Sequence, residues 1–99
     1  MPKRNQDVPS EYREHESAVA EAMGIRIRQR RRKLKLTQEQ VRTRMEAEGV
    51  SMSAMQYSRV ENGDSLLNAA EVIALAAVLE VSYKWLLEGE EPSSRGKQL

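Results

Sequence analysis

The sequence predicts a small all-α protein, and three observations lead to that prediction. Capping boxes, in which Ser, Thr or Asn precedes Glu or Gln by three residues, begin at Thr37, Ser53 and Asn68. Apolar residues recur at helical spacing after each of them, and no segment alternates as a strand does. With 99 residues, 39% of them hydrophobic, the chain can build one modest aliphatic core.

We expect residues 1–22 to form an N-terminal extension, an arm followed by a possible extra helix. Residues 1–9 are polar with two prolines, and Lys3 and Arg4 there are either a minor-groove arm or a tail without a role. The stretch from Ser10 onward is rich in helix formers with early acids. It is either a separate helix or the beginning of the next one.

The helix predicted over residues 24–36 carries a charge within its apolar stripe. Met23, Ile27 and Leu34 recur at helical spacing, and Arg31 falls on the same stripe. A buried guanidinium needs an acidic partner. The remaining cations of this region are expected to divide between solvent and nonspecific phosphate attraction: Arg26, Arg28, Arg30, Arg32, Lys33 and Lys35.

Two short helices follow and a turn connects them. The first begins after Thr37 and should end near Glu48, where Gly49 can adopt the left-handed backbone that closes many helices. The second begins after Ser53, with its apolar side facing inward, and Asn62-Gly63 stops it.

Two further helices complete a predicted domain over residues 23–89. One begins after Asn68 and presents an apolar face, and a shorter one is capped by Ser82 and anchored by Trp85. Residues 90–99 are polar without periodicity, so we expect a disordered tail.

Charge and composition limit the function. Residues 25–64 hold ten basic and five acidic residues, a charge of +5 against +1 for the chain, which suits either a phosphate-binding surface or a solvated helix face. There is no Cys and one His, His15, so we predict no metal, no cofactor and no enzymatic activity. No apolar run is long enough for a membrane span, and we expect a cytoplasmic protein.

Four motifs, in this order and spacing, resemble the lambda-repressor-like, or Cro/Xre, family of helix-turn-helix regulators. The resemblance covers residues 23–89 and implies a five-helix DNA-binding domain. The motifs are Gln38-Glu39-Gln40-Val41, Gly49-Val50-Ser51, Glu61-Asn62-Gly63 and Leu79-Glu80-Val81-Ser82-Tyr83-Lys84-Trp85-Leu86-Leu87.

The resemblance assigns roles to individual residues. It implies a salt bridge between Arg31 and Glu61, although both side chains could instead point outward. Met55 has an alternative as a core residue, and Arg59 as a solvated or phosphate-bound cation. Base-reading positions are Ala54, Met55, Gln56 and Arg59, and phosphate-binding positions are Gln38, Ser53, Ser58 and Asn62.

Some residues depart from the family pattern. Arg42 replaces a small residue between the two short helices, so it either extends outward or widens their crossing. Glu80 stands where the family favours Gly, at a cost of up to about 1 kcal/mol if the backbone is left-handed. Asp64 and Ser65 replace basic residues, which puts phosphate contacts from that loop in doubt.

The resemblance implies double-stranded DNA as the partner and a transcriptional regulator, a repressor, as the function. One such domain buries little DNA, so a homodimer is expected, formed through the last helix around Tyr83 and Leu87 or through the N-terminal helix with Tyr12 and Val19. The alternative function is an antitoxin-like module that masks a partner protein and regulates its own operon.

Overall fold

The computed structural model describes residues 10–89, so the expectations for residues 1–9 and 90–99 lie outside the described part. Within it the chain is entirely helical, as the sequence predicts. The helices are α2 (Ser10–Lys33), α3 (Gln38–Ala47), α4 (Ala54–Glu61), α5 (Ala69–Leu79) and α6 (Tyr83–Glu88).

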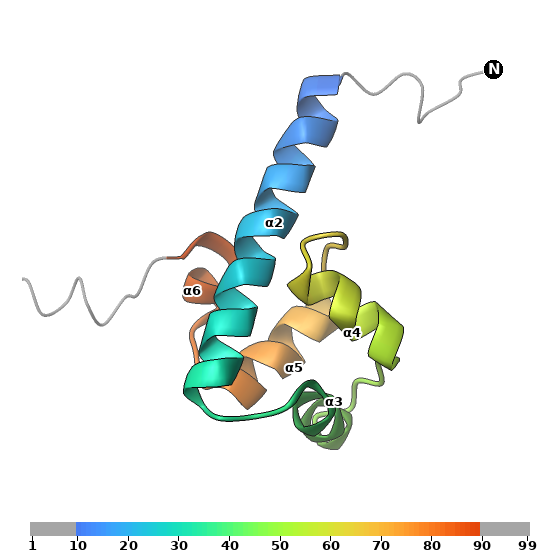
Figure 1. The fold of residues 1–99 in the computed structure, drawn as a ribbon, viewed down its shortest axis with the longest axis vertical. Helices are drawn as coiled ribbons and strands as arrows, with labels where there is room; N and C mark the ends of the chain where they lie inside the picture. The colour runs from blue at the N-terminus through green and yellow to red at the C-terminus, as the bar shows by residue number, and fades with distance from the viewer. Residues whose placement is uncertain (1–9, 90–99) are drawn as a thin grey trace, which may run out of the picture.

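Helix α2 joins the extension to the domain without a break. It has 24 residues, a length of about 36 Å, and its N-terminal half projects beyond the other helices in Figure 1. The segment that begins at Ser10 is therefore the start of the first domain helix, and the expected boundary between residues 22 and 23 lies inside α2. Lys35, with φ 62°, turns the chain after the helix ends.

Side-chain caps begin the next three helices. Thr37, Ser53 and Asn68 each accept a hydrogen bond from a backbone N–H in the first turn, and each predicted capping box is present with both of its bonds. These boxes satisfy backbone donors that a helix leaves unpaired at its start. They fix the beginning of α3, α4 and α5 at the predicted residues.

Residues with a left-handed backbone follow α3 and α5, and for Gly49 after α3 the sequence predicts this conformation. Gly49 follows the end of α3 with φ 93°. Glu80 ends α5 with φ 60° and ψ 49°, so the chain places a side chain where Gly is favoured and bears that conformational cost.

The core lies between the five helices, where α2 packs on α4, α5 and α6, and α3 packs on α4 and α5. Figure 1 shows α4 and α6 on opposite sides of α2, with α5 behind it. The largest fully buried side chains come from all five helices: Met23, Ile27, Val41, Met45, Tyr57, Val60, Leu75, Leu79 and Leu86.

A glycine allows α2 to pack directly on the end of α4. A Cβ atom on Gly24 would lie 2.6 Å from the carbonyl oxygen of Val60 and 2.7 Å from that of Glu61. On the other side, a Cβ on Gly63 would lie 2.9 Å from the Cα of Glu21. The two backbones therefore touch at a point that no larger residue can occupy without displacement.

Two arginines of α2 bind the ends of other helices. Arg26 donates to the carbonyl oxygen of Leu86 at 3.0 Å, and Arg30 donates to that of Leu79 at 2.8 Å. These contacts satisfy carbonyls near the C-terminal ends of α6 and α5. The prediction that these two cations face only solvent or phosphate was wrong, because partners on distant helices cannot be read from spacing along α2.

None of the helices in the described part of the chain combines the length and the apolar character that a membrane span requires.

Candidate nucleic-acid interface

Helix α4 presents one face to solvent and buries the other. Tyr57, Val60 and Glu61 are buried, whereas Met55 is 65% exposed and Arg59 is exposed one turn further along. Asn62, seven residues after Met55, continues the same exposed stripe at helical spacing. Met55 is therefore not a core residue in this structure.

At its N-terminal end, α4 uses two of the predicted site residues for its own cap. The Ser53 hydroxyl accepts from the backbone N–H of Gln56 at 3.1 Å, and the Gln56 side-chain oxygen accepts from the backbone N–H of Ser53 at 2.9 Å. Bidentate pairing of a glutamine with adenine uses both its oxygen and its nitrogen. The cap therefore engages the same oxygen that the contact with adenine would use.

Glu61 lies at the centre of a buried polar cluster. Arg31 donates to it through Nε at 2.6 Å and through Nη2 at 2.9 Å, which is a bidentate ion pair. The Tyr57 hydroxyl donates to the same carboxylate at 2.6 Å, and Gln38 Nε2 donates to it at 3.0 Å. Glu61 is only 2% exposed, and both oxygens of its carboxylate accept hydrogen bonds.

The pKa values in this cluster follow from the contacts. Burial acts to raise the pKa of the Glu61 carboxyl, but hydrogen bonds from Arg31, Tyr57 and Gln38 outweigh it and hold that pKa below its ordinary value. Burial and the hydrogen bond to Glu61 raise the pKa of Tyr57. The carboxylate is therefore charged and the phenol neutral at neutral pH.

Gln38 connects this cluster to the surface. Its side chain is only partly buried, and a single amide N–H is engaged by Glu61. The second N–H and the amide oxygen remain for a contact with a ligand. Gln38 stands at the first position of α3, where free backbone amides also face outward.

Arg28 is a site residue that the sequence did not single out. Its Nη2 donates to the Asn62 side-chain oxygen at 2.6 Å, and its Nε lies 3.5 Å from a carboxylate oxygen of Glu61. Spacing along α2 groups Arg28 with five other cations. Only the crossing of α2 over the end of α4 distinguishes it.

Arg42, the residue that departs from the family pattern on α3, extends along the turn. Its Nη1 lies 3.5 Å from the carbonyl oxygen of Met52, just before the α4 cap, and the residue is partly buried.

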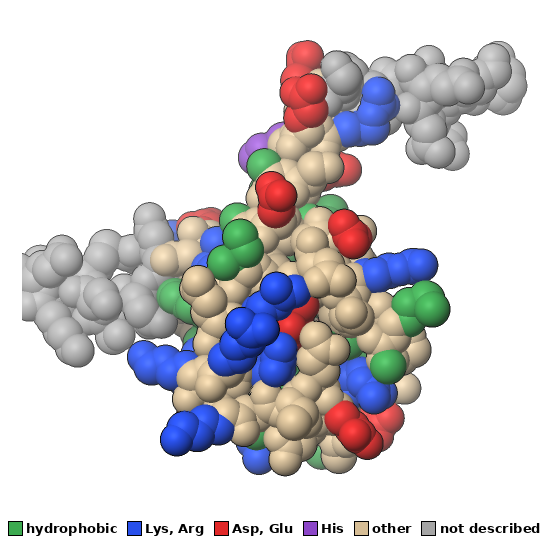
Figure 2. All heavy atoms as spheres, viewed as in Figure 1, with side chains coloured by type: hydrophobic (Ala, Val, Ile, Leu, Met, Phe, Trp, Pro, Cys, Tyr) green, Lys and Arg blue, Asp and Glu red, His purple; other side chains and the backbone are tan. Residues whose placement is uncertain are grey.

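The surface charge divides along α2. Figure 2 shows Lys and Arg side chains gathered over the C-terminal half of α2 beside α4, and Asp and Glu side chains along its projecting end. A surface of one sign next to an exposed helix face attracts a polyanion and orients it.

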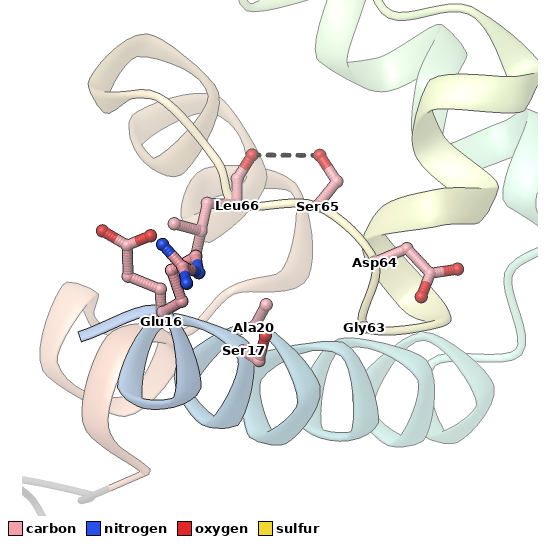
Figure 3. A pocket seen from close by; sticks show the side chains of 8 residues that line it. Glu16, Ser17, Ala20, Gly63, Asp64, Ser65 and Leu66 are labelled. Carbon is pink, nitrogen blue, oxygen red and sulfur yellow. Dashed lines mark hydrogen bonds between the residues drawn. The ribbon is translucent and has the colours of Figure 1, made fainter. Parts of the chain in front are cut away.

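The loop after α4 does not belong to this basic surface. Figure 3 shows Glu16, Ser17 and Ala20 of α2 facing the loop from Gly63 to Leu66 across an open pocket of about 450 Å³. The lining holds two acidic side chains, Asp64 and Glu16, and one cation, Arg13, so its net charge is negative and disfavours a phosphate. In residues 10–89, no group of three or more His, Cys, Asp or Glu is arranged to hold a metal ion.

Together α3, the turn and α4 form a helix-turn-helix unit with one face of its second helix free. A family model described as a helix-turn-helix domain matches residues 22–88, more than half of the chain. The chain therefore belongs to this helix-turn-helix domain family, which agrees with the Cro/Xre resemblance and indicates a DNA-binding regulator. Comparison with curated proteins gives no match, and neither does comparison with solved structures.

Proposed function

We propose that this chain is a sequence-specific transcriptional regulator that binds double-stranded DNA through the major groove. The observation that carries the proposal is the exposed stripe of α4, on which the side chains of Met55 and Arg59 lie in solvent. An α-helix fits the major groove, and the second helix of this motif enters it with its N-terminal residues near the bases.

The chemistry of the stripe defines what it can read. Arg59 can donate two hydrogen bonds to O6 and N7 of guanine. Ala54 and Met55 offer only apolar contact, which is best matched to the methyl group of thymine. Specificity from one domain therefore rests on one polar reader and two apolar ones.

Backbone contacts support these base contacts in the proposal. Gln38 is partly exposed at the start of α3, Ser58 is partly exposed beside the α4 stripe, and Asn62 is exposed at the end of that stripe. Ser53 contributes through the N-terminal end of α4. These contacts fix the orientation of the helix in the groove and carry no sequence information.

A homodimer is part of the proposal, because one domain of this size buries little DNA. An exposed apolar patch on α5 and α6 supports it: Ile73 is 55% exposed and Tyr83 is 57% exposed. Together with Ala77 and Val81 they line a hollow of about 390 Å³. Such a dimer would act as a repressor by occupying a promoter.

The test is fluorescence anisotropy of the full chain with a duplex from upstream of its own gene and with a shuffled duplex, each at two salt concentrations. Tighter binding to the upstream duplex that persists at the higher salt supports a specific regulator. Equal binding or none contradicts it and favours the antitoxin-like alternative, which a copurifying protein would then identify.

A further inference from the structure

The C-terminal end of α4 needs a cation if it is to approach a phosphate. The last carbonyl groups of a helix carry a partial negative charge, and Glu61 adds a full one. Arg31 neutralises Glu61 through the bidentate pair. The loop that follows supplies Asp64 and no basic residue, so any surplus positive charge at this end must come from another element.

Arg28 of α2 supplies that charge. With Arg31 and Glu61 it forms a group of two cations and one carboxylate, a local charge of +1. Its side chain is 38% exposed, whereas that of Arg31 is 12% exposed. Arg28 is therefore the member of the cluster that an external anion can reach.

Asn62 holds Arg28 in place. The 2.6 Å hydrogen bond occupies the Asn62 oxygen, which leaves the NH₂ group of the same amide as a donor. A guanidinium with remaining N–H groups and an amide NH₂ beside it form a pair of donors suited to phosphate oxygens.

The position of this pair along α4 matches the dimensions of the groove. Asn62 follows Met55 by seven residues, which is about 10 Å along the helix axis. The major groove is about 12 Å wide, and phosphates border it on both sides. When Met55 is at the bases, the far end of the stripe is thus near one of the two strands.

We propose that Arg28, held by Asn62, binds a phosphate of the DNA strand that borders the groove at the C-terminal end of α4. This inference rests on the proposed function. The contact positions the recognition helix and is independent of the base sequence. It replaces the contacts that the acidic loop after Gly63 cannot make.

The experiment compares Arg28→Ala with Lys33→Ala in the full chain. Both variants remove one positive charge from α2, but Lys33 lies on the other side of the helix, beside Val81 and Trp85. Binding to a mixed-sequence duplex and to the duplex from upstream of the gene is measured from about 50 to 200 mM salt.

We expect Arg28→Ala to reduce the slope of log K against log salt by about 0.9 for each bound domain on both duplexes, and by about twice that for a bound homodimer. The loss in affinity is about eightfold per domain at about 0.1 M salt. Lys33→Ala should leave the slope unchanged. If circular dichroism shows that Arg28→Ala is unfolded, Arg28→Gln takes its place in the comparison. Gln has no charge but keeps most of the side-chain stem, so the same reduction in slope is expected.

If the slope of log K against log salt is the same for the Arg28 and Lys33 variants, the inference is overturned and the proposed function stays intact. A loss confined to one duplex also overturns it, because a phosphate contact acts on any sequence. Failure of the unmodified chain to bind either duplex overturns the proposed function and the inference together.

Discussion

At the scale of the residue, Glu61 determines how α2, α3 and α4 fit together. Its carboxylate receives hydrogen bonds from one side chain of each of these helices, Arg31, Gln38 and Tyr57. A buried ion pair adds little compared with apolar packing, but breaking one leaves an uncompensated charge inside. The sequence could place Arg31 on an apolar stripe, yet the convergence of three donors depends on helix crossings that no spacing reveals.

Glu61→Ala should lower the free energy of unfolding by about 3 kcal/mol, because Arg31 and Tyr57 lose their acceptor in the interior. Thermal and urea denaturation measure the change. Glu46→Ala on the exposed face of α3 is the control and should change stability by less than about 0.5 kcal/mol.

The same cluster gives the variant a distinct pH dependence. The folded-state pKa of Glu61 is below its ordinary value of 4.5, so its stabilising contribution is complete above that pH and is lost as the pH falls further. Glu61→Ala should therefore show a weaker loss of stability on acidification than the original chain. Parallel curves for the two proteins would show that Glu61 does not titrate with unfolding.

Arg59→Ala should relax the preference for one base pair, at a cost of about 1–3 kcal/mol in discrimination, while the thermal midpoint stays nearly constant. The reason is that Arg59 is exposed on α4. Binding to a panel of single-base-pair variants of the preferred duplex measures the effect. A large fall in the thermal midpoint would instead give Arg59 a structural role.

At the scale of the element, helix boundaries were more predictable than helix partners. The capping residues predict where α3, α4 and α5 begin, because both hydrogen bonds of each box join residues only three positions apart. For the segment from Ser10 the sequence predicts either a separate helix or the beginning of the next one, and the structure shows one continuous helix, α2. The structure also gives a physical reason for Gly24: the absence of a Cβ lets the backbone of α4 approach.

Gly24→Ala tests that reason through the sign of its effect. In an unobstructed helix the change would stabilise the protein by about 0.5–1 kcal/mol. Here the new Cβ would meet two backbone carbonyls at 2.6 and 2.7 Å, so we expect a destabilisation of about 1–3 kcal/mol. Urea denaturation decides between them, and a gain in stability would mean that α2 moves aside without cost.

At the scale of the whole molecule, charge and apolar surface are separated. The basic half of α2 lies beside α4, and the acidic half projects away from the core (Figure 2). The excess charge of residues 25–64 was evident from the sequence, but its distribution was not, since Arg26 and Arg30 serve other helices. Apolar side chains are exposed on α6, at Tyr83, and on the projecting part of α2, at Tyr12, and these are the two candidate surfaces for the proposed dimer.

Tyr83→Glu and Tyr12→Glu separate those two surfaces. The tyrosines are similarly exposed, at 57% and 61%, so the substitutions introduce the same change in matched settings. We expect Tyr83→Glu to shift the protein toward monomer in sedimentation velocity and to weaken DNA binding, because it places a charge in an apolar patch. The opposite result, with Tyr12→Glu alone dissociating the protein, would place the dimer contact on α2.

The unbroken course of α2 has a mechanical consequence. The turns that project from the domain and the turns that touch α4 at Gly24 belong to one helix, and the backbone of that helix packs directly against the backbone of α4. A rigid helical protein fused in phase to the N-terminal end of α2 would therefore keep a constant angle to α4. Each residue added at the junction would rotate the fused protein by about 100° about the axis of α2, so its orientation relative to the domain can be chosen by the length of the junction.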